Sequence, residues 1–157
     1  MEIIEASGKH IPEIVELWKE FMDFHQEIEP AAKRGEEGHI AFEKYLRDSI
    51  QAEDFQVLVA QDDNEVSGFS ISQISKPLPV YEQEDYGLIS TIAVKAGYRR
   101  KGIGELLLSK IFGWFDSRNV DRIELNVMAR NQIGYSFWKK HGFTDYVHRL
   151  YLDRESS

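Results

Sequence analysis

The 157-residue sequence contains no cysteine, which excludes disulfides, thiolate metal ligands and cysteine nucleophiles. It also lacks an apolar run of the roughly 18 residues that a membrane-spanning helix needs. Its first residues, MEIIEAS, show neither the basic nor the apolar segment of a secretory signal. We therefore expect a cytoplasmic protein with no membrane partner.

An excess of basic charge is also absent. The 19 Lys and Arg residues are outnumbered by 27 Asp and Glu residues, so the net charge is −8. This balance argues against broad nucleic-acid binding, which needs a basic face. It favours a cationic substrate, although surface acid that only keeps the protein soluble explains the charge equally well. No repeat or flexible linker is present, so residues 1–157 are expected to form one domain.

The spacing of apolar residues predicts the order β-α-α-β-β-β-α-β-α-β. The helices are expected at residues 12–28, 37–53, 103–115 and 131–141. The strands are expected at residues 2–6, 55–60, 66–74, 88–94, 123–127 and 143–152. Asn131 suits the N-cap of the last helix, and Gly142 suits the position after its end. This order predicts an α/β (α+β) fold with a mixed central sheet flanked by helices.

The most informative stretch is a strand followed by a short basic turn and an apolar helix. It reads IAV at 92–94, KAGY at 95–98 and RRKGIG at 99–104. The first N–H groups of a helix have no partner within it, and the helix dipole adds positive potential there. Gly102 and Gly104 allow the backbone to approach a ligand without a Cβ in the way. The stretch is therefore typical of a diphosphate-binding site.

Two other phosphate-binding motifs do not fit this stretch. No Ser or Thr follows a Gly-Lys pair, as the P-loop requires. The dinucleotide fingerprint needs a third glycine where Leu107 stands. The competing interpretation is a basic turn whose glycines serve only helix packing.

At this point the sequence resembles the GNAT superfamily of N-acetyltransferases. The segment 99–104 matches the acyl-CoA motif Q/R-x-x-G-x-G/A of that family. A second pattern, N-x-x-A-x-x-F-Y-x-x-x-G-F, is matched in order and spacing. The residues at its positions are Asn131, Gly134, Phe137, Trp138, Gly142 and Phe143, with Gly in place of Ala and Trp in place of Tyr.

The resemblance implies a set of cofactor contacts. The backbone of Ile92, Ala93 and Val94 would pair with the pantetheine arm, and the amide of Ile92 or Ala93 would face the thioester carbonyl. Backbone N–H groups from Arg100 to Gly104 would hold the diphosphate. The other residues expected at the cofactor are Arg99, Lys101, Ile103, Asn131, Tyr135 and Trp138.

The resemblance further implies direct transfer of an acetyl group from acetyl-CoA to a primary amine. The acceptor would be a small molecule or a peptide or protein amine. A noncatalytic acyl-CoA-binding sensor on the same fold is the main alternative, and an unrelated phosphate-binding α/β domain is the other. Dimers are common among relatives, so a homodimer is also considered. No cluster of His, Asp and Glu has metal-ligand spacing, so no metal is expected.

The residues that would move protons depart from the family pattern. Many relatives have a Tyr acid where this chain has Trp138, and some have a Glu base where it has Asn126. Tyr135 is the substitute acid, although packing or cofactor contact is its commoner role. Glu124 and Asp85 are candidate bases, with Asp85 acting through water. The competing interpretation for both carboxylates is solvated surface acid.

Overall fold

The computed structural model describes residues 1–155 of the chain. The chain forms two compact units, Met1–Asn126 and a second unit that begins at Val127. None of the helices in the described part of the chain is long and apolar enough to span a membrane.

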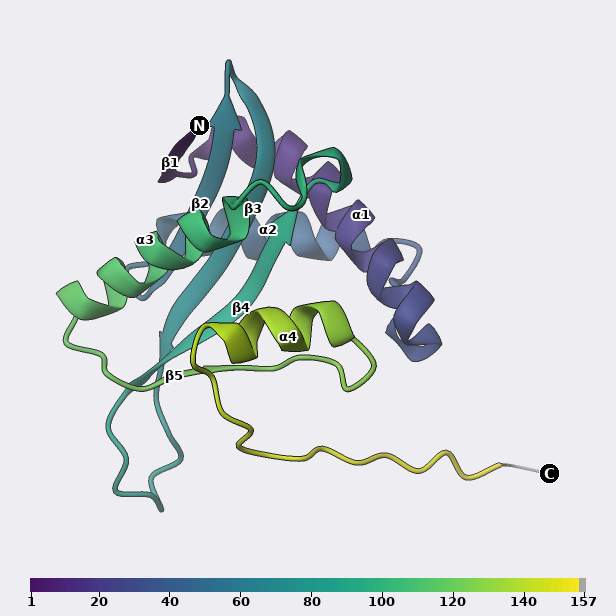
Figure 1. The fold of residues 1–157 in the computed structure, drawn as a ribbon, viewed down its shortest axis with the longest axis vertical. Coiled ribbons are helices and arrows are strands. Elements are labelled where there is room, and N and C mark those ends of the chain that lie inside the picture. The colour runs from purple at the N-terminus through teal and green to yellow at the C-terminus, as the bar shows by residue number, and fades with distance from the viewer. Residues whose placement is uncertain (156–157) are drawn as a thin grey trace. The chain divides into compact units, whose positions relative to one another are not determined.

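The first unit contains a five-stranded mixed sheet in the order β1-β2-β3-β4-β5 (Figure 1). Its strands are β1 (Glu2–Glu5), β2 (Phe55–Asp62), β3 (Glu65–Ser75), β4 (Tyr86–Val94) and β5 (Ile123–Leu125). The first four strands pair antiparallel, and β5 pairs parallel with β4. The hairpin between β2 and β3 turns through Asp63 and Asn64, whose φ angles are 47° and 68°. Positive φ at both central turn residues matches the right-handed twist of the two strands.

Helices cover both faces of this sheet. The helices of the first unit are α1 (Ile11–Ile28), α2 (Gly38–Gln51) and α3 (Ile103–Ser117), with short 3₁₀ turns at η1 (Gly8–His10), η2 (Pro30–Ala32) and η3 (Ala96–Tyr98). Alternate strand residues such as Val59, Phe69 and Ile71 pack with α1 and α2 in one buried cluster. Gly68, the residue before Phe69, faces the opposite side of the sheet, toward Ile103 of α3.

The second unit contains α4 (Gln132–Lys140), whose two ends confirm the sequence prediction. Asn131 caps the helix, because its side-chain oxygen accepts a hydrogen bond of 2.9 Å from the Gly134 N–H. Gly142 follows the helix with a φ of 93°, a conformation that favours glycine.

The predicted final strand at residues 143–152 is not formed, so that prediction was wrong. The segment has no ladder partner in the described residues, and Tyr146 and Leu150 are 66% and 89% exposed. Alternating β-prone side chains indicate only what a strand prefers, whereas a strand exists only when a neighbour accepts its hydrogen bonds. The other nine predicted elements are present with boundaries shifted by a few residues.

The contact between Gly87 and Phe115 yields a stability prediction. A Cβ at Gly87 would lie 2.6 Å from the buried Phe115 ring. We expect Gly87→Ala to lower the free energy of unfolding by about 1–3 kcal/mol, because the ring has no room to move. Urea denaturation measures this change.

Gly113→Ala is the matched control. Gly113 is exposed in the interior of α3, and nothing lies within 4 Å of an added Cβ. We expect this change to raise the free energy of unfolding by about 0.4–1 kcal/mol. Equal effects of the two substitutions would contradict the proposed close contact.

Candidate active site at the open edge of β4

One edge of β4 changes from paired to open partway along the strand. The register with β5 pairs only Gly87, Leu88 and Ile89 with β5 residues. Within residues 1–126, no strand pairs with this edge beyond Ile89. The C-terminal half of β4 therefore has backbone groups available to another extended chain.

The direction of the β4 amides follows from one hydrogen bond at the end of the strand. The Lys95 N–H donates to the Ser67 carbonyl at 2.8 Å, toward β3. Because strand amides alternate in direction, Ala93 also faces β3 while Ile92 and Val94 face the open edge. The Val94 carbonyl accordingly accepts a bond of 3.4 Å from Arg99 Nε. Of the two amides expected at the thioester, the amide of Ile92 is therefore the one that faces the open edge.

A bulge in β4 accounts for the open edge. The register with β3 passes from Thr91 directly to Ile89, so Ser90 is an extra residue. Before the bulge, the Gly87 N–H donates to the Arg122 carbonyl at 2.8 Å on the β5 side. The extra residue bends a strand and shifts its alternation by one position. Pairing with β5 therefore stops where the amides of Ile92 and Val94 begin to face outward.

The turn after β4 has the backbone geometry of an anion-binding site. Arg100 has a φ of 66° and Gly102 a φ of 77°, and Gly102 is the N-cap of α3. A left-handed conformation is costly for arginine, and such strain is concentrated at functional sites. Left-handed residues near a helix start direct successive N–H groups into one concavity. The turn thus directs unpaired donors to the same place as the positive end of the α3 dipole.

The basic side chains around the turn fall into two groups. Lys95 and Arg99 form ion pairs with acidic residues elsewhere in the first unit, at 3.0 Å with Glu65 and 3.9 Å with Glu20. By contrast, Arg100 makes no side-chain hydrogen bond or ion pair with any residue in the described range. Lys101 lies only over the ring of Tyr98, at 5.3 Å. Arg100 and Lys101 are therefore the two cations of the turn that no carboxylate in the described residues pairs with.

Glu65 fixes the first part of the turn. Hydrogen bonds from Lys95 and Tyr98 to its carboxylate hold the pKa of Glu65 below its ordinary value of 4.5. A lowered carboxyl pKa contributes stability above pH 4.5 that is lost as the pH falls through the folded-state pKa. The same contact raises the pKa of the Tyr98 hydroxyl.

The three predicted site residues of the second unit lie on or beside α4. The Asn131 side-chain oxygen is occupied as the helix cap, at 2.9 Å from the Gly134 N–H. The Tyr135 hydroxyl donates to Asp145 at 2.9 Å, and this bond raises the pKa of Tyr135 above its ordinary value of 10.0. The Trp138 ring meets the Phe143 ring edge-on, with centroids 5.3 Å apart.

The two predicted bases lie toward the other end of β4 from the turn. Glu124 stands opposite Leu88 in the register, roughly 13 Å along the strand from Ile92. Its carboxylate accepts bonds from Arg122 Nε at 2.8 Å and from Gln83 at 3.4 Å. Asp85 precedes β4, roughly 20 Å from Ile92.

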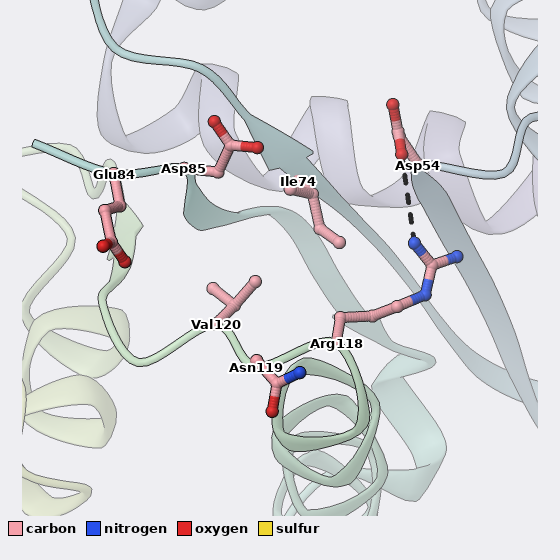
Figure 2. Close-up of a pocket in the computed structure, with 7 residues that line it drawn as sticks. All are labelled: Asp54, Ile74, Glu84, Asp85, Arg118, Asn119 and Val120. Carbon is pink, nitrogen blue, oxygen red and sulfur yellow. Dashed lines mark ion pairs between the residues drawn. The ribbon is translucent and has the colours of Figure 1, made fainter.

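Asp85 faces a separate pocket, which is drawn in Figure 2. The pocket has a volume of about 500 Å³. Its ion pair joins Asp54 and Arg118 at 3.9 Å. Arg118 follows the last residue of α3, whereas the turn after β4 precedes the first residue of that helix. The pocket and the turn therefore lie at opposite ends of α3. The lining residues are Asp54, Ile74, Glu84, Asp85, Arg118, Asn119 and Val120.

Sequence reasoning missed the acidic and aromatic residues that hold the turn. These residues are Glu20, Phe24 and Glu65. Glu20 lies 76 positions before the backbone amide that it contacts, and no local pattern indicates such a pairing. In the described residues, no group of three or more His, Cys, Asp or Glu side chains is arranged to hold a metal ion.

An open strand edge that leads into an anion-binding helix start defines an α/β domain suited to an extended, phosphate-bearing cofactor. Residues 14–143 match the sequence model of the Acetyltransferase (GNAT) family. The match covers most of the chain and extends from the first compact unit into the second, so the protein belongs to this family. No curated protein matches the sequence.

Solved structures share the fold along the whole chain. A tetramutant of the BH1408 protein from Bacillus halodurans is 25% identical with a TM-score of 0.88, covering 98% of this chain and 100% of that one. The aminoglycoside antibiotic 6′-N-acetyltransferase AAC(6′)-IG from Acinetobacter haemolyticus is 15% identical with a TM-score of 0.78, covering 100% of both chains. The aminoglycoside N-acetyltransferase AAC(6′)-Iy, solved in complex with CoA, is 15% identical with a TM-score of 0.73, covering 99% and 95%.

The bond between Tyr135 and Asp145 yields a titration prediction. Because the carboxylate favours the neutral phenol, Tyr135 should ionise above pH 10.0. Asp145→Asn should lower the pKa of Tyr135 toward that value. NMR titration of the tyrosine ring signals measures the change, with Tyr135→Phe used to assign the signal.

Tyr98 is the internal control for this titration. Its pKa is raised by Glu65, so Asp145→Asn should leave it unchanged. A Tyr135 pKa that is the same in the wild type and in Asp145→Asn would show that the bond is not formed in solution.

Proposed function

We propose that this protein is an N-acetyltransferase that transfers the acetyl group of acetyl-CoA directly to a primary amine. The observation that carries the proposal is the open edge of β4 at Ile92 and Val94, which continues into the turn at Arg100–Gly102. Pantetheine is an extended chain with amide groups, and CoA carries a diphosphate. The open strand edge therefore matches the pantetheine arm, and the turn that follows it matches the diphosphate.

In this arrangement the cofactor lies along the open edge as an additional strand would. The outward amides and carbonyls of Ile92 and Val94 pair with the amides of pantetheine. The backbone donors from Arg100 to Gly104 hold the diphosphate at the start of α3. The Arg100 and Lys101 side chains add positive charge beside it.

The proposed reaction is an addition followed by an elimination. The lone pair of a neutral amine forms a bond to the thioester carbon, and the carbonyl π electrons move to oxygen. The Ile92 N–H donates to this oxyanion, and one such donor typically changes the rate by about 10²–10³. The oxyanion then reforms the carbonyl, the C–S bond breaks with its electron pair on sulfur, and the nitrogen loses a proton to give the amide.

The proton carriers are part of the proposal. An ammonium with a pKa near 10.4 must lose a proton before it attacks. A direct base must be within hydrogen-bond reach of that proton, or one water away. Glu124 and Asp85 stay the candidate bases, and at roughly 13 Å and roughly 20 Å along the strand from Ile92 each would act through a chain of waters. Tyr135 is the candidate acid for the thiolate, although the bond to Asp145 raises its pKa and so weakens it as an acid. A thiol with a pKa near 8.5 can also leave as thiolate and take its proton from water.

We propose a cationic acceptor, either a small molecule or a peptide or protein amine. The net charge of −8 favours approach of such a substrate. Fold neighbours include an aminoglycoside N-acetyltransferase solved with a bisubstrate analogue, at 15% identity. A cytoplasmic location and assembly as a homodimer also stay predictions.

A noncatalytic acyl-CoA sensor on the same fold is the second candidate. Trp138 and Asn126 stand where relatives have an acid and a base, and neither side chain can exchange a proton near neutral pH. A sensor would bind acetyl-CoA without transferring its acetyl group.

An amine panel distinguishes the enzyme from the sensor. We expect release of CoA thiol, above the hydrolysis background, with at least one amine from a panel of polyamines, aminoglycosides and lysine peptides. A thiol-reactive dye measures the release, and mass spectrometry identifies the amide. Binding of acetyl-CoA without transfer to any amine would favour the sensor.

The turn itself is tested with substitutions at Gly102. We expect Gly102→Glu to raise the Kd for acetyl-CoA on the order of tenfold or more, because it adds negative charge beside the diphosphate. Isothermal titration calorimetry measures the Kd. Gly102→Ala has no charge but shares the backbone strain of a side chain at a φ of 77°, so the difference between the two variants isolates the charge.

Gly113→Glu is the matched control for charge. It places the same charge at an exposed position of the same helix, far from its N-terminus. We expect its Kd for acetyl-CoA to match that of the wild type. A Gly102→Glu variant that binds as tightly as this control would place the diphosphate elsewhere.

A further inference from the structure

Glu20 of α1 contacts the turn at two points. Its Oε1 atom accepts a hydrogen bond of 2.7 Å from the backbone N–H of Ala96, the first residue of η3. The same oxygen lies 3.9 Å from Nη2 of Arg99. One carboxylate therefore holds the backbone at the start of the turn and a side chain near its centre.

Phe24 lies one helical turn after Glu20 and completes this contact. The Arg99 guanidinium carbon is 4.9 Å from the centroid of the Phe24 ring. Arg99 Nε also donates to the Val94 carbonyl at 3.4 Å. The guanidinium thus lies between α1 and the end of β4, with 44% of the Arg99 side chain exposed.

These contacts explain how a strained turn is kept in one conformation. Arg100 and Gly102 have left-handed backbone angles that neighbouring residues must hold in place. Arg99 immediately precedes them, and its side chain is anchored to Glu20 and Phe24. Anchoring Arg99 therefore reduces the conformational freedom that the turn would lose when a diphosphate binds.

We propose that Glu20 is a positioning residue for acetyl-CoA, acting through the Ala96 amide and Arg99 to preorganise the diphosphate-binding turn. The proposal rests on the proposed function of the site. It also gives Arg99 a role different from that of Arg100 and Lys101. Arg99 holds the turn against α1, while the other two cations face the ligand.

The test compares three substitutions by their effect on cofactor binding and on turnover. We expect Glu20→Ala to raise the Kd and KM for acetyl-CoA about tenfold while kcat changes less than twofold, because a charge-assisted bond that orders the site is lost. Glu20→Gln retains an acceptor for the Ala96 N–H and should recover part of this loss. Phe24→Leu removes the ring beneath Arg99 and should give a smaller loss than Glu20→Ala.

A double-mutant cycle with Arg99→Ala tests whether the effect passes through Arg99. If part of it does, Glu20→Ala should raise the Kd less in the Arg99→Ala background than in the wild type, and the rise that remains measures the bond to the Ala96 N–H. Glu16→Ala is the matched control, because Glu16 lies one turn earlier on α1 and, among the described residues, pairs only with Lys19, at 3.1 Å on an exposed surface. Its Kd for acetyl-CoA should equal that of the wild type.

The outcomes separate this proposal from the proposed function. A wild-type protein that does not bind acetyl-CoA would overturn the function. If the wild type binds but Glu20→Ala binds equally well, the function stands and the positioning role is wrong. A Glu20→Ala variant that loses kcat without any change in KM would also overturn the positioning role, and full additivity with Arg99→Ala would overturn the part of it that is assigned to Arg99.

Discussion

The candidate site depends on the main-chain groups of β4 beyond Ile89 that face away from β3 and pair with no strand in the described residues. A buried backbone amide requires a hydrogen-bond partner, and in the proposed complex the pantetheine arm supplies it. The extra residue Ser90 creates this open edge, because it bends β4 and reverses the direction of the amides that follow. The part of β4 that pairs with β5 and the part proposed to bind the cofactor are therefore two halves of the same strand edge.

The turn after β4 is shaped by opposite charges that lie far away in sequence. Glu65 holds Lys95 and Tyr98, and Glu20 holds Ala96 and Arg99. Acidic residues next to an anion site appear unfavourable, yet they neutralise only those groups that give the turn its form. Arg100 and Lys101 keep their charge for a ligand. The net charge of −8 is thus compatible with one locally basic site.

Close packing fixes the position of α3 and with it the position of the turn after β4. Gly68 and Gly87 of neighbouring strands leave room for Ile103 near the start of α3 and for Phe115 near its end. A side chain at either glycine would move the helix relative to the sheet, because protein interiors have few voids to absorb it. The N-terminus of α3 is consequently held at the end of β4.

The sequence by itself determined the features that depend on neighbouring residues: nine of the ten elements, the cap at Asn131, and the glycine-containing basic turn before α3. Tertiary structure alone decided that Ile92 rather than Ala93 faces the open edge, since this depends on the register with β3. It also decided that Arg99 is held by Glu20, and that residues 143–152 form no strand. Local propensity acts over a few residues, whereas strand pairing and ion pairs join residues that only folding brings together.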